Sequence, residues 1–186
     1  MLNSISWSRL MSSSPGAGPA EASGAPDWGA KSVCELVDYI LVNHHAVERS
    51  SLSRLRGLAE EAVRRSTGSL PVLAKVASAL AQLTEELLAH MDREEQVLFP
   101  LLLEREAEGR TGAANWDRET ELARLHREHD HAGDLLQDLR ILTQDYSLQG
   151  VSGDDLSPLF AELKSLDGDL QLHIELENRW LFSRAN

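Results

Sequence analysis

Residues 83–99 read LTEELLAHMDREEQVLF, and residues 166–182 read LDGDLQLHIELENRWLF. The two stretches align without a gap. They are identical at Leu83/Leu166, Leu87/Leu170, His90/His173, Glu94/Glu177, Leu98/Leu181 and Phe99/Phe182. The repeat therefore preserves one His-x-x-x-Glu motif together with the apolar residues around it, which is the pattern of a duplicated metal half-site.

Both copies lie on stripes with the period of an α-helix, because residues three and four apart share one helix face. The first stripe is Leu73, Val76, Leu80, Leu83, Leu87, His90, Glu94, Val97 and Leu101. The second is Leu156, Leu159, Leu163, Leu166, Leu170, His173, Glu177 and Trp180. A histidine and a glutamate thus take core positions, where burial costs several kcal/mol unless a partner is present. A bound metal ion is the most economical partner.

The composition describes one acidic domain. A chain of 186 residues with 42% hydrophobic residues can bury one core. Its formal charge of -12 argues against nucleic acid or an anionic membrane as a partner. No apolar run has membrane-spanning length and no secretory signal is visible, so we expect a cytoplasmic protein. The single cysteine, Cys34, excludes an intramolecular disulfide, and we expect it to be a small buried residue of the first helix.

The chain divides into a tail and a helical domain. Residues 1–31 include a Pro/Gly/Ser-rich segment without periodicity, which predicts a disordered tail. Ser32-x-x-Glu35 is a capping box ahead of an apolar-periodic run, so the ordered domain is expected over residues 32–186.

Four helical patterns fill that domain. They are expected at residues 32–64, from 71 past 100, at 117–146, and from about 155 to near the C-terminus, separated by loops at 65–71, 105–115 and 147–154. Pro100 lacks a backbone donor and should kink or end the second helix. With no strand pattern and these loop lengths, the sequence predicts an all-α fold, an antiparallel up-down four-helix bundle.

The first and third helices offer further histidines. On the first helix, His44 and His45 lie on neighbouring apolar lines, and the pattern alone leaves both open. On the third, His129 lies centrally on the apolar stripe, His126 at its flank, and His131 points away toward solvent. A lone interior histidine is more often a hydrogen-bonded core residue than a ligand. Together with the two His-x-x-x-Glu motifs, however, one inward histidine from each helix gives four imidazoles and two carboxylates in one layer, enough for two ions.

The donor types favour iron. Six ligands exceed the four of a structural zinc site, and calcium and magnesium prefer oxygen-rich shells. Mixed imidazole and carboxylate donors fit iron, with manganese or zinc as substitutes. If both glutamates bridge and an oxo or hydroxo group does too, about one position per iron stays open for a small diatomic ligand. The order His-x-x-x-Glu also differs from the Glu-x-x-His motif of ferritin-like di-iron proteins.

These motifs resemble the hemerythrin-like domain, and within it the di-iron proteins called repair of iron centres. The resemblance rests on residues 38–45, 86–100, 128–130, 142–146, 173–178 and 181–182. It selects His45 over His44 and His129 over His126. It implies that the iron ligands are His45, His90, His129 and His173, with Glu94 and Glu177 as bridging carboxylates.

The sequence departs from that family in three places. The family's N-terminal domain with a cysteine pair is not expected here, where the Pro/Gly-rich tail takes its place. The family's final Leu-Phe-Pro reads Leu-Phe-Ser183. Oxygen-carrying hemerythrins use a fifth histidine, and His126 is expected to stay outside the ligand set.

The resemblance implies two iron ions per chain and a role in nitric oxide or oxidative stress, by binding or reducing nitric oxide in support of iron-sulfur cluster repair. The expected partners are then nitric oxide or dioxygen, an iron-sulfur client protein and a redox partner. The alternative is a module that binds dioxygen reversibly for storage or sensing. A metal-free bundle is disfavoured, because burying six such side chains without an ion is costly.

Overall fold

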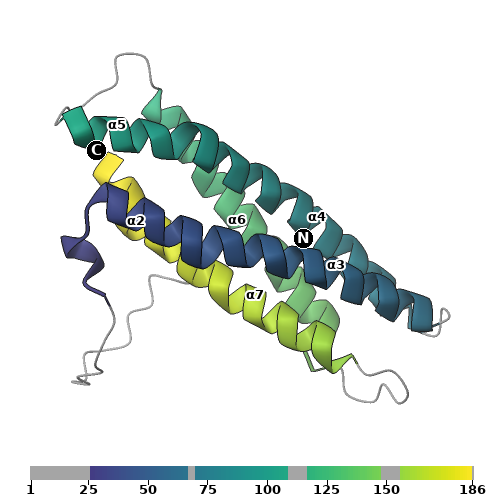
Figure 1. Ribbon diagram of the computed structural model, residues 1–186. Coiled ribbons are helices and arrows are strands. Elements are labelled where there is room, and N and C mark those ends of the chain that lie inside the picture. Colours follow the sequence, from purple (N-terminus) through teal and green to yellow (C-terminus); the bar gives the residue numbers. More distant parts are fainter. Residues whose placement is uncertain (1–25, 67–69, 109–116, 148–155, 186) are drawn as a thin grey trace, which may run out of the picture.

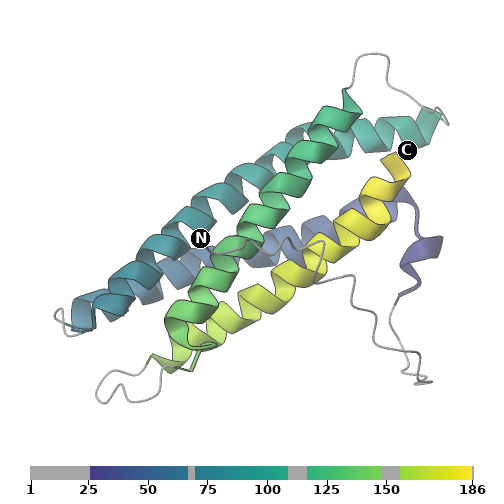
Figure 2. The same ribbon diagram turned by 180° about the vertical axis from the view of Figure 1, so that it is seen from behind.

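The computed structural model describes residues 26–66, 70–108, 117–147 and 156–185. Within them the chain forms an antiparallel up-down bundle of four long helices (Figures 1 and 2). Helix one comprises α2 (Val33–Ile40), η2 (Leu41–His45) and α3 (Ala46–Ser66); helix two α4 (Pro71–Arg93), η3 (Glu94–Leu98) and α5 (Phe99–Glu108); helix three α6 (Arg118–Thr143); and helix four α7 (Ser157–Leu176), η4 (Glu177–Leu181) and η5 (Phe182–Ala185). The predicted fold class is confirmed.

Helix one begins where the sequence predicts. The Ser32 hydroxyl accepts a hydrogen bond from the backbone N–H of Glu35, and the Glu35 carboxylate accepts one from the backbone N–H of Ser32 at 2.9 Å. These reciprocal bonds satisfy donors that the first helical turn leaves without partners.

The predicted tail differs from the structure at its end. Residues 1–25 lie outside the described residues. Residues 26–31 include the 3-10 turn η1 (Trp28–Ala30), whose Trp28 ring packs edge-on against Tyr39 at 4.6 Å between centroids. Arg184 donates hydrogen bonds to the carbonyls of Trp28 and Gly29. This turn is therefore attached to the beginning of helix one and to the end of helix four.

Two helix boundaries differ from the prediction. Helix two extends past Pro100, as predicted, but continues to Glu108, beyond the predicted start of the loop at residue 105. Its irregular part is the π-helical turn η3, which precedes the proline. Helices one and four carry π-helical turns with no proline after them, so Pro100 is not the common cause. Helix three ends at Thr143, three residues before the predicted end, because Gln144 takes a left-handed φ of 52°.

Two apolar clusters fill the bundle, one on each side of a polar layer. The larger occupies the end where helices one and two are joined, and it holds most of the leucines of the two stripes, including Leu73, Leu80, Leu83, Leu87, Leu159, Leu163, Leu166 and Leu170. The smaller lies at the other end and contains Val33, Leu36, Val37, Ile40, Leu98, Phe99, Leu102, Leu125, Leu181 and Phe182. The polar layer is therefore closed off from solvent along the bundle axis.

The π-helical turns move the buried face by one residue. The stripe predicted Val97 in the core, but Val97 is 47% exposed while Leu98 is 3% exposed. Likewise Leu181 is fully buried where the stripe predicted Trp180. A π-helical turn closes its hydrogen bonds over five residues instead of four, so the residues after it rotate relative to a regular α-helix. The prediction for Val97 was wrong for that reason.

Cys34 also differs from the prediction. It is exposed on the first turn of helix one, with its sulfur 3.9 Å from the carboxylate of Asp38. The apolar neighbours that point inward there are Val33, Leu36 and Val37.

None of the helices in the described part of the chain combines the length and apolar character that crossing a bilayer requires.

Candidate metal centre

The six residues singled out in the sequence meet in the polar layer. They come from all four helices and none is more than 5% exposed: His45, His90, Glu94, His129, His173 and Glu177. The π-helical turns lie at these positions, since η2 ends at His45, η3 begins at Glu94 and η4 begins at Glu177. Such turns widen a helix locally and are frequent at functional sites.

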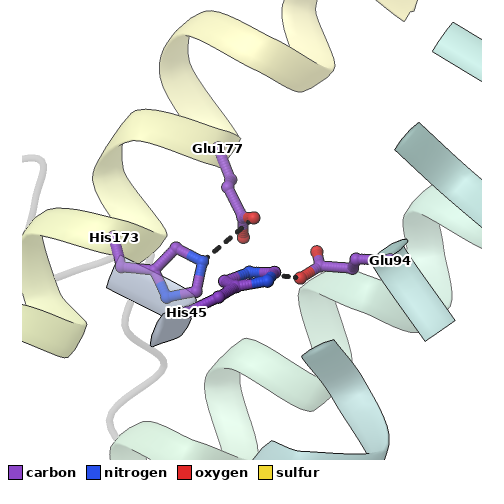
Figure 3. A group of neighbouring side chains, drawn as sticks. All are labelled: His45, Glu94, His173 and Glu177. Carbon is purple, nitrogen blue, oxygen red and sulfur yellow. Dashed lines mark ion pairs between the residues drawn. The ribbon is translucent and has the colours of Figure 1, made fainter. Parts of the chain in front are cut away.

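The six side chains form two overlapping groups. His45 and His173 lie with both glutamates in one group, and His90 and His129 lie with the same glutamates in the other. In each group, one nitrogen or oxygen from every residue lies within 4.8 Å of the others. Figure 3 shows the first group, with Glu177 and Glu94 directed toward the rings of His173 and His45. Two carboxylates shared between two histidine pairs are the arrangement expected of ligands that bridge two ions.

The histidine rings are oriented by hydrogen bonds on their outer nitrogens. Each Nδ1 lies near one acceptor: Glu95 for His45 at 2.9 Å, Glu128 for His90 at 2.9 Å, Asn178 for His129 at 3.2 Å, and Glu48 for His173 at 2.9 Å. An Nδ1–H facing such an acceptor leaves the lone pair on Nε2, which points inward. This second layer of hydrogen bonds is characteristic of metal-binding histidines.

The inner atoms lack the partners that a hydrogen-bonded core would give them. Among the described residues, neither oxygen of Glu94 or Glu177 makes a hydrogen bond, nor does Nε2 of His45 or His173. These atoms meet only as ion pairs, 3.4 Å apart for His45 and Glu94 and 3.0 Å apart for His173 and Glu177. The Nε2 atoms of His90 and His129 lie 3.1 Å apart, so their lone pairs repel unless a proton or cation lies between. Buried polar atoms without partners are costly. The donor set therefore fits a metal ion better than a metal-free core.

The electrostatics of the two glutamates lead to the same conclusion. Burial, followed by the charge of Glu177, raises the pKa of Glu94 well above its usual 4.5. Burial also favours the neutral form of Glu177, but the charge on His173 and the close approach of the His129 and His173 imidazoles hold its pKa well below 4.5. Two carboxylates in one dry layer resist carrying charge together. A cation between them removes that conflict.

The pKa of His173 shows how strongly the carboxylates act. Burial lowers this pKa, yet the charges of Glu177 and Glu48 outweigh burial and raise it well above 6.5. The pKa values of His45 and His90 shift in the opposite direction. Burial dominates at these two residues and lowers their pKa below 6.5. Neutral imidazole is the form that binds a metal.

The roles of the outer residues Glu48, Glu95, Glu128 and Asn178 were not predicted from the sequence. Two of them carry a signal that was available, because Glu95 and Asn178 occupy equivalent positions of the repeat, one residue after each candidate bridging glutamate. Each holds a histidine of another helix. Glu48 has no such signal, and its complete burial becomes visible only in the packed structure.

The three other histidines lie outside both groups. His44 is buried, but its Nδ1 pairs with Asp169 at 3.1 Å. His126 is exposed, with its ring 6.0 Å from that of Phe182. His131 is half exposed and pairs with Glu86, as expected of a surface residue.

A cavity of about 390 Å³ reaches the layer from one side. It lies between helices two, three and four and touches His90, His129 and His173. Arg93 and Arg124 lie at its wall and both donate hydrogen bonds to Glu128. Burial favours the neutral form of Glu128, but hydrogen bonds from His90 and Arg124 lower its pKa to about 2. A small ligand can thus approach the metal layer past fixed charges.

A four-helix bundle with a buried layer of histidines and shared carboxylates defines a class of helical metal-binding proteins. Residues 36–185 match the Hemerythrin HHE cation binding domain. This match covers most of the chain, and the chain belongs to that family.

Several curated relatives carry the name iron-sulfur cluster repair protein YtfE. The protein of Cronobacter sakazakii is 31% identical over 166 residues, which is 89% of this chain and 72% of that protein. The proteins of Enterobacter sp. (strain 638) and Escherichia coli O157:H7 are each 30% identical over 159 residues, covering 86% of this chain and 69% of theirs. The resemblance noted in the sequence is confirmed.

Proposed function

We propose that this chain is a non-haem di-iron protein. His45 and His173 would hold one iron ion, His90 and His129 the other, and Glu94 and Glu177 would bridge the two, together with an oxo or hydroxo group. The observation that carries this proposal is the pair of histidine groups that share both buried carboxylates. Nitrogen-rich mixed donors support iron over magnesium or calcium.

The di-iron centre that we propose serves the response to nitric oxide and oxidative stress. The relatives' name, iron-sulfur cluster repair protein, supports this role. The ligand is nitric oxide, which the protein binds or reduces. In the reductive form, two nitric oxide molecules, two electrons and two protons give nitrous oxide and water, with the electrons drawn from an external redox partner. When bound, the iron ions would supply the open coordination positions and pass on the electrons of the redox partner.

The chain's own residues support this chemistry in three ways. The carboxylates outside the histidine rings fix which nitrogen faces inward. The apolar clusters on both sides of the layer exclude water along the bundle axis. The cavity beside His90 and His129 leaves room for a diatomic molecule. We also infer a cytoplasmic setting, with an iron-sulfur protein as client.

The test is an anaerobic titration of the reduced, iron-loaded protein with nitric oxide, followed by spectroscopy and by gas analysis for nitrous oxide. We expect a nitric oxide adduct in the wild type and in His131→Ala, which removes a histidine from the cavity wall but not from the layer. His129→Ala should lose it. A spectrum that nitric oxide leaves unchanged, with no turnover when a reductant is present, contradicts the proposal.

The same reduced, iron-loaded protein distinguishes the nitric oxide role from the alternative function, reversible binding of dioxygen. Reversible uptake of dioxygen through several gas-exchange cycles, without turnover of nitric oxide, would favour storage or sensing of dioxygen. Rapid oxidation of the reduced protein on the first cycle would favour the nitric oxide role.

A further inference from the structure

A second polar cluster lies directly behind the proposed di-iron layer. It consists of His44, Glu48 and Asp169, which offer one ligand atom each within 4.8 Å of one another. His44 is 4% exposed and Glu48 is fully buried, while the side chain of Asp169 is 24% exposed. None of the three belongs to the six residues of the layer.

His44 has the same hydrogen-bond pattern as the four histidines of the layer. Its Nδ1 lies 3.1 Å from a carboxylate oxygen of Asp169, and its Nε2 is buried with no hydrogen-bond partner among the described residues. The ring is held between two others, stacked on His173 at 5.4 Å and edge-on to Tyr39 at 5.7 Å. Its orientation is therefore fixed, with Nδ1 on the side of Asp169 and Nε2 on the opposite side of the ring.

Each of the two carboxylates of the cluster also has one oxygen without a hydrogen-bond partner. One oxygen of Glu48 pairs with Nδ1 of His173 at 2.9 Å, but its other oxygen is buried without a partner. Asp169 uses one oxygen for His44 and leaves the other buried without a partner. These statements hold for the part of the chain that the structure describes. An ion shared by the three residues would therefore bind Nδ1 of His44, the nitrogen that faces Asp169, together with one oxygen from each carboxylate. Carboxylate oxygens that are buried without a partner are costly for a fold and well suited to a cation.

A separate hollow leads to this cluster from the surface. Its volume is about 150 Å³, and it is lined by His44 together with Trp28, Tyr39, Leu172, Glu175 and Trp180, among others. It opens between helix one and helix four, whereas the larger cavity opens beside helices two and three. A hydrated cation can thus reach His44 without passing through the di-iron layer.

We propose that His44, Glu48 and Asp169 bind a third ion, a divalent first-row transition metal such as Mn²⁺, Fe²⁺ or Zn²⁺. One imidazole and two carboxylates suit these ions, and water completes the coordination. Glu48 then connects the third ion to the centre, because its other oxygen holds the ring of His173. The site goes beyond the proposed function and takes none of the six residues of the layer.

Manganese binding to the protein as purified, with its central metal in place, tests this proposal. Mn²⁺ is the weakest binder of the first-row series, so it leaves the central ions undisturbed, and its free form is counted by electron paramagnetic resonance. We expect the wild type to bind about one Mn²⁺ per chain. His44→Phe keeps an aromatic ring in place, and Asp169→Asn keeps a hydrogen-bond acceptor. Each should weaken Mn²⁺ binding by at least about tenfold.

Glu175→Gln is the matched control, because Glu175 lines the same hollow and its loss changes the net charge as Asp169→Asn does. It should bind Mn²⁺ like the wild type. No bound Mn²⁺ in the wild type, equal binding in all variants, or an equal loss in Glu175→Gln overturns the proposal. Central metal is measured in the same samples by elemental mass spectrometry. Its loss in His44→Phe and Asp169→Asn also overturns the third site, whereas its absence from the wild type overturns the di-iron centre alone.

Discussion

The two sides of the metal layer use the same ligand types in different surroundings. His90 and His129 border the 390 Å³ cavity, and the acceptors behind them are one carboxylate, Glu128, and one neutral amide, Asn178. Of the other pair, His173 also borders that cavity, whereas His45 does not. Behind His45 and His173 stand two carboxylates, Glu95 and Glu48, the second fully buried.

This difference in acceptors predicts that the two sides differ in how tightly they bind their ion and in how accessible that ion is to small ligands. A carboxylate behind an imidazole makes it a stronger donor than an amide does. The side of His45 and His173 is therefore expected to hold its ion more tightly, and the side of His90 and His129 to expose its ion to small ligands. A duplicated motif thus produces two unequal positions, because the acceptors behind the histidines differ, both within the repeat at Glu95 and Asn178 and on helices one and three at Glu48 and Glu128.

The largest effect should follow from giving His173 a neutral acceptor like the one behind His129. Glu48→Gln keeps an acceptor for His173 but removes its charge, as Asn178 has none. We expect affinity for the central metal to fall by about tenfold or more. Competition with a coloured chelator measures this affinity.

The reverse change sharpens the same comparison. Asn178→Asp gives His129 a charged acceptor and should slow the release of metal to the chelator. If Glu48→Gln and Asn178→Asp change metal affinity in the same direction, the charge of the acceptor does not decide how tightly each side holds its ion.

A smaller effect is expected from narrowing the 390 Å³ cavity beside His90 and His129. Ala89 is exposed on α4 and lines the cavity, so Ala89→Trp should obstruct it at little cost to folding. Binding of nitric oxide should slow several-fold in stopped-flow measurements, with metal content unchanged. Ala81→Trp, at an exposed position of the same helix away from this cavity, is the control. Equal rates in both variants would mean that the ligand arrives by another route.

The apolar half of the bundle follows from the sequence because nothing interrupts its helical period. Leu73 through Leu87 and Leu159 through Leu170 lie in the core where the stripes predict them. The period fails at Val97, since the π-helical turn that widens the helix at Glu94 has no counterpart in a 3.6-residue pattern.

The six candidate ligands were predictable because the repeat marks four of them, and the family resemblance selects His45 and His129. Their outer partners were not all predictable. Glu48 comes three residues after His45 and meets His173 from another helix, a pairing that depends on how helices one and four pack. The prediction that Cys34 is buried was wrong for a related reason. The bundle covers only the inner face of the first turn of helix one, and Cys34 lies on the outer face.

The smallest effect concerns pH. The pKa of Glu128 is lowered from 4.5 to about 2 by the groups around it, so the folded state favours its charged form. A depressed pKa in the folded state contributes stability that is fully present above pH 4.5 and is lost as the pH falls toward 2. In metal-free protein, Glu128→Gln should flatten the fall in urea-unfolding free energy across this window. An unchanged slope would show that Glu128 does not contribute to it.

The metal content of the purified protein, measured by elemental mass spectrometry, is the most direct test of the di-iron centre. Wild type should be compared with Glu94→Ala and Glu177→Ala, and with Glu85→Ala, which removes an exposed glutamate from α4. The account predicts about two irons per chain in the wild type and in Glu85→Ala, and a sharp loss of both ions in the other two. Metal below one ion per chain that is insensitive to Glu94 and Glu177 would contradict it.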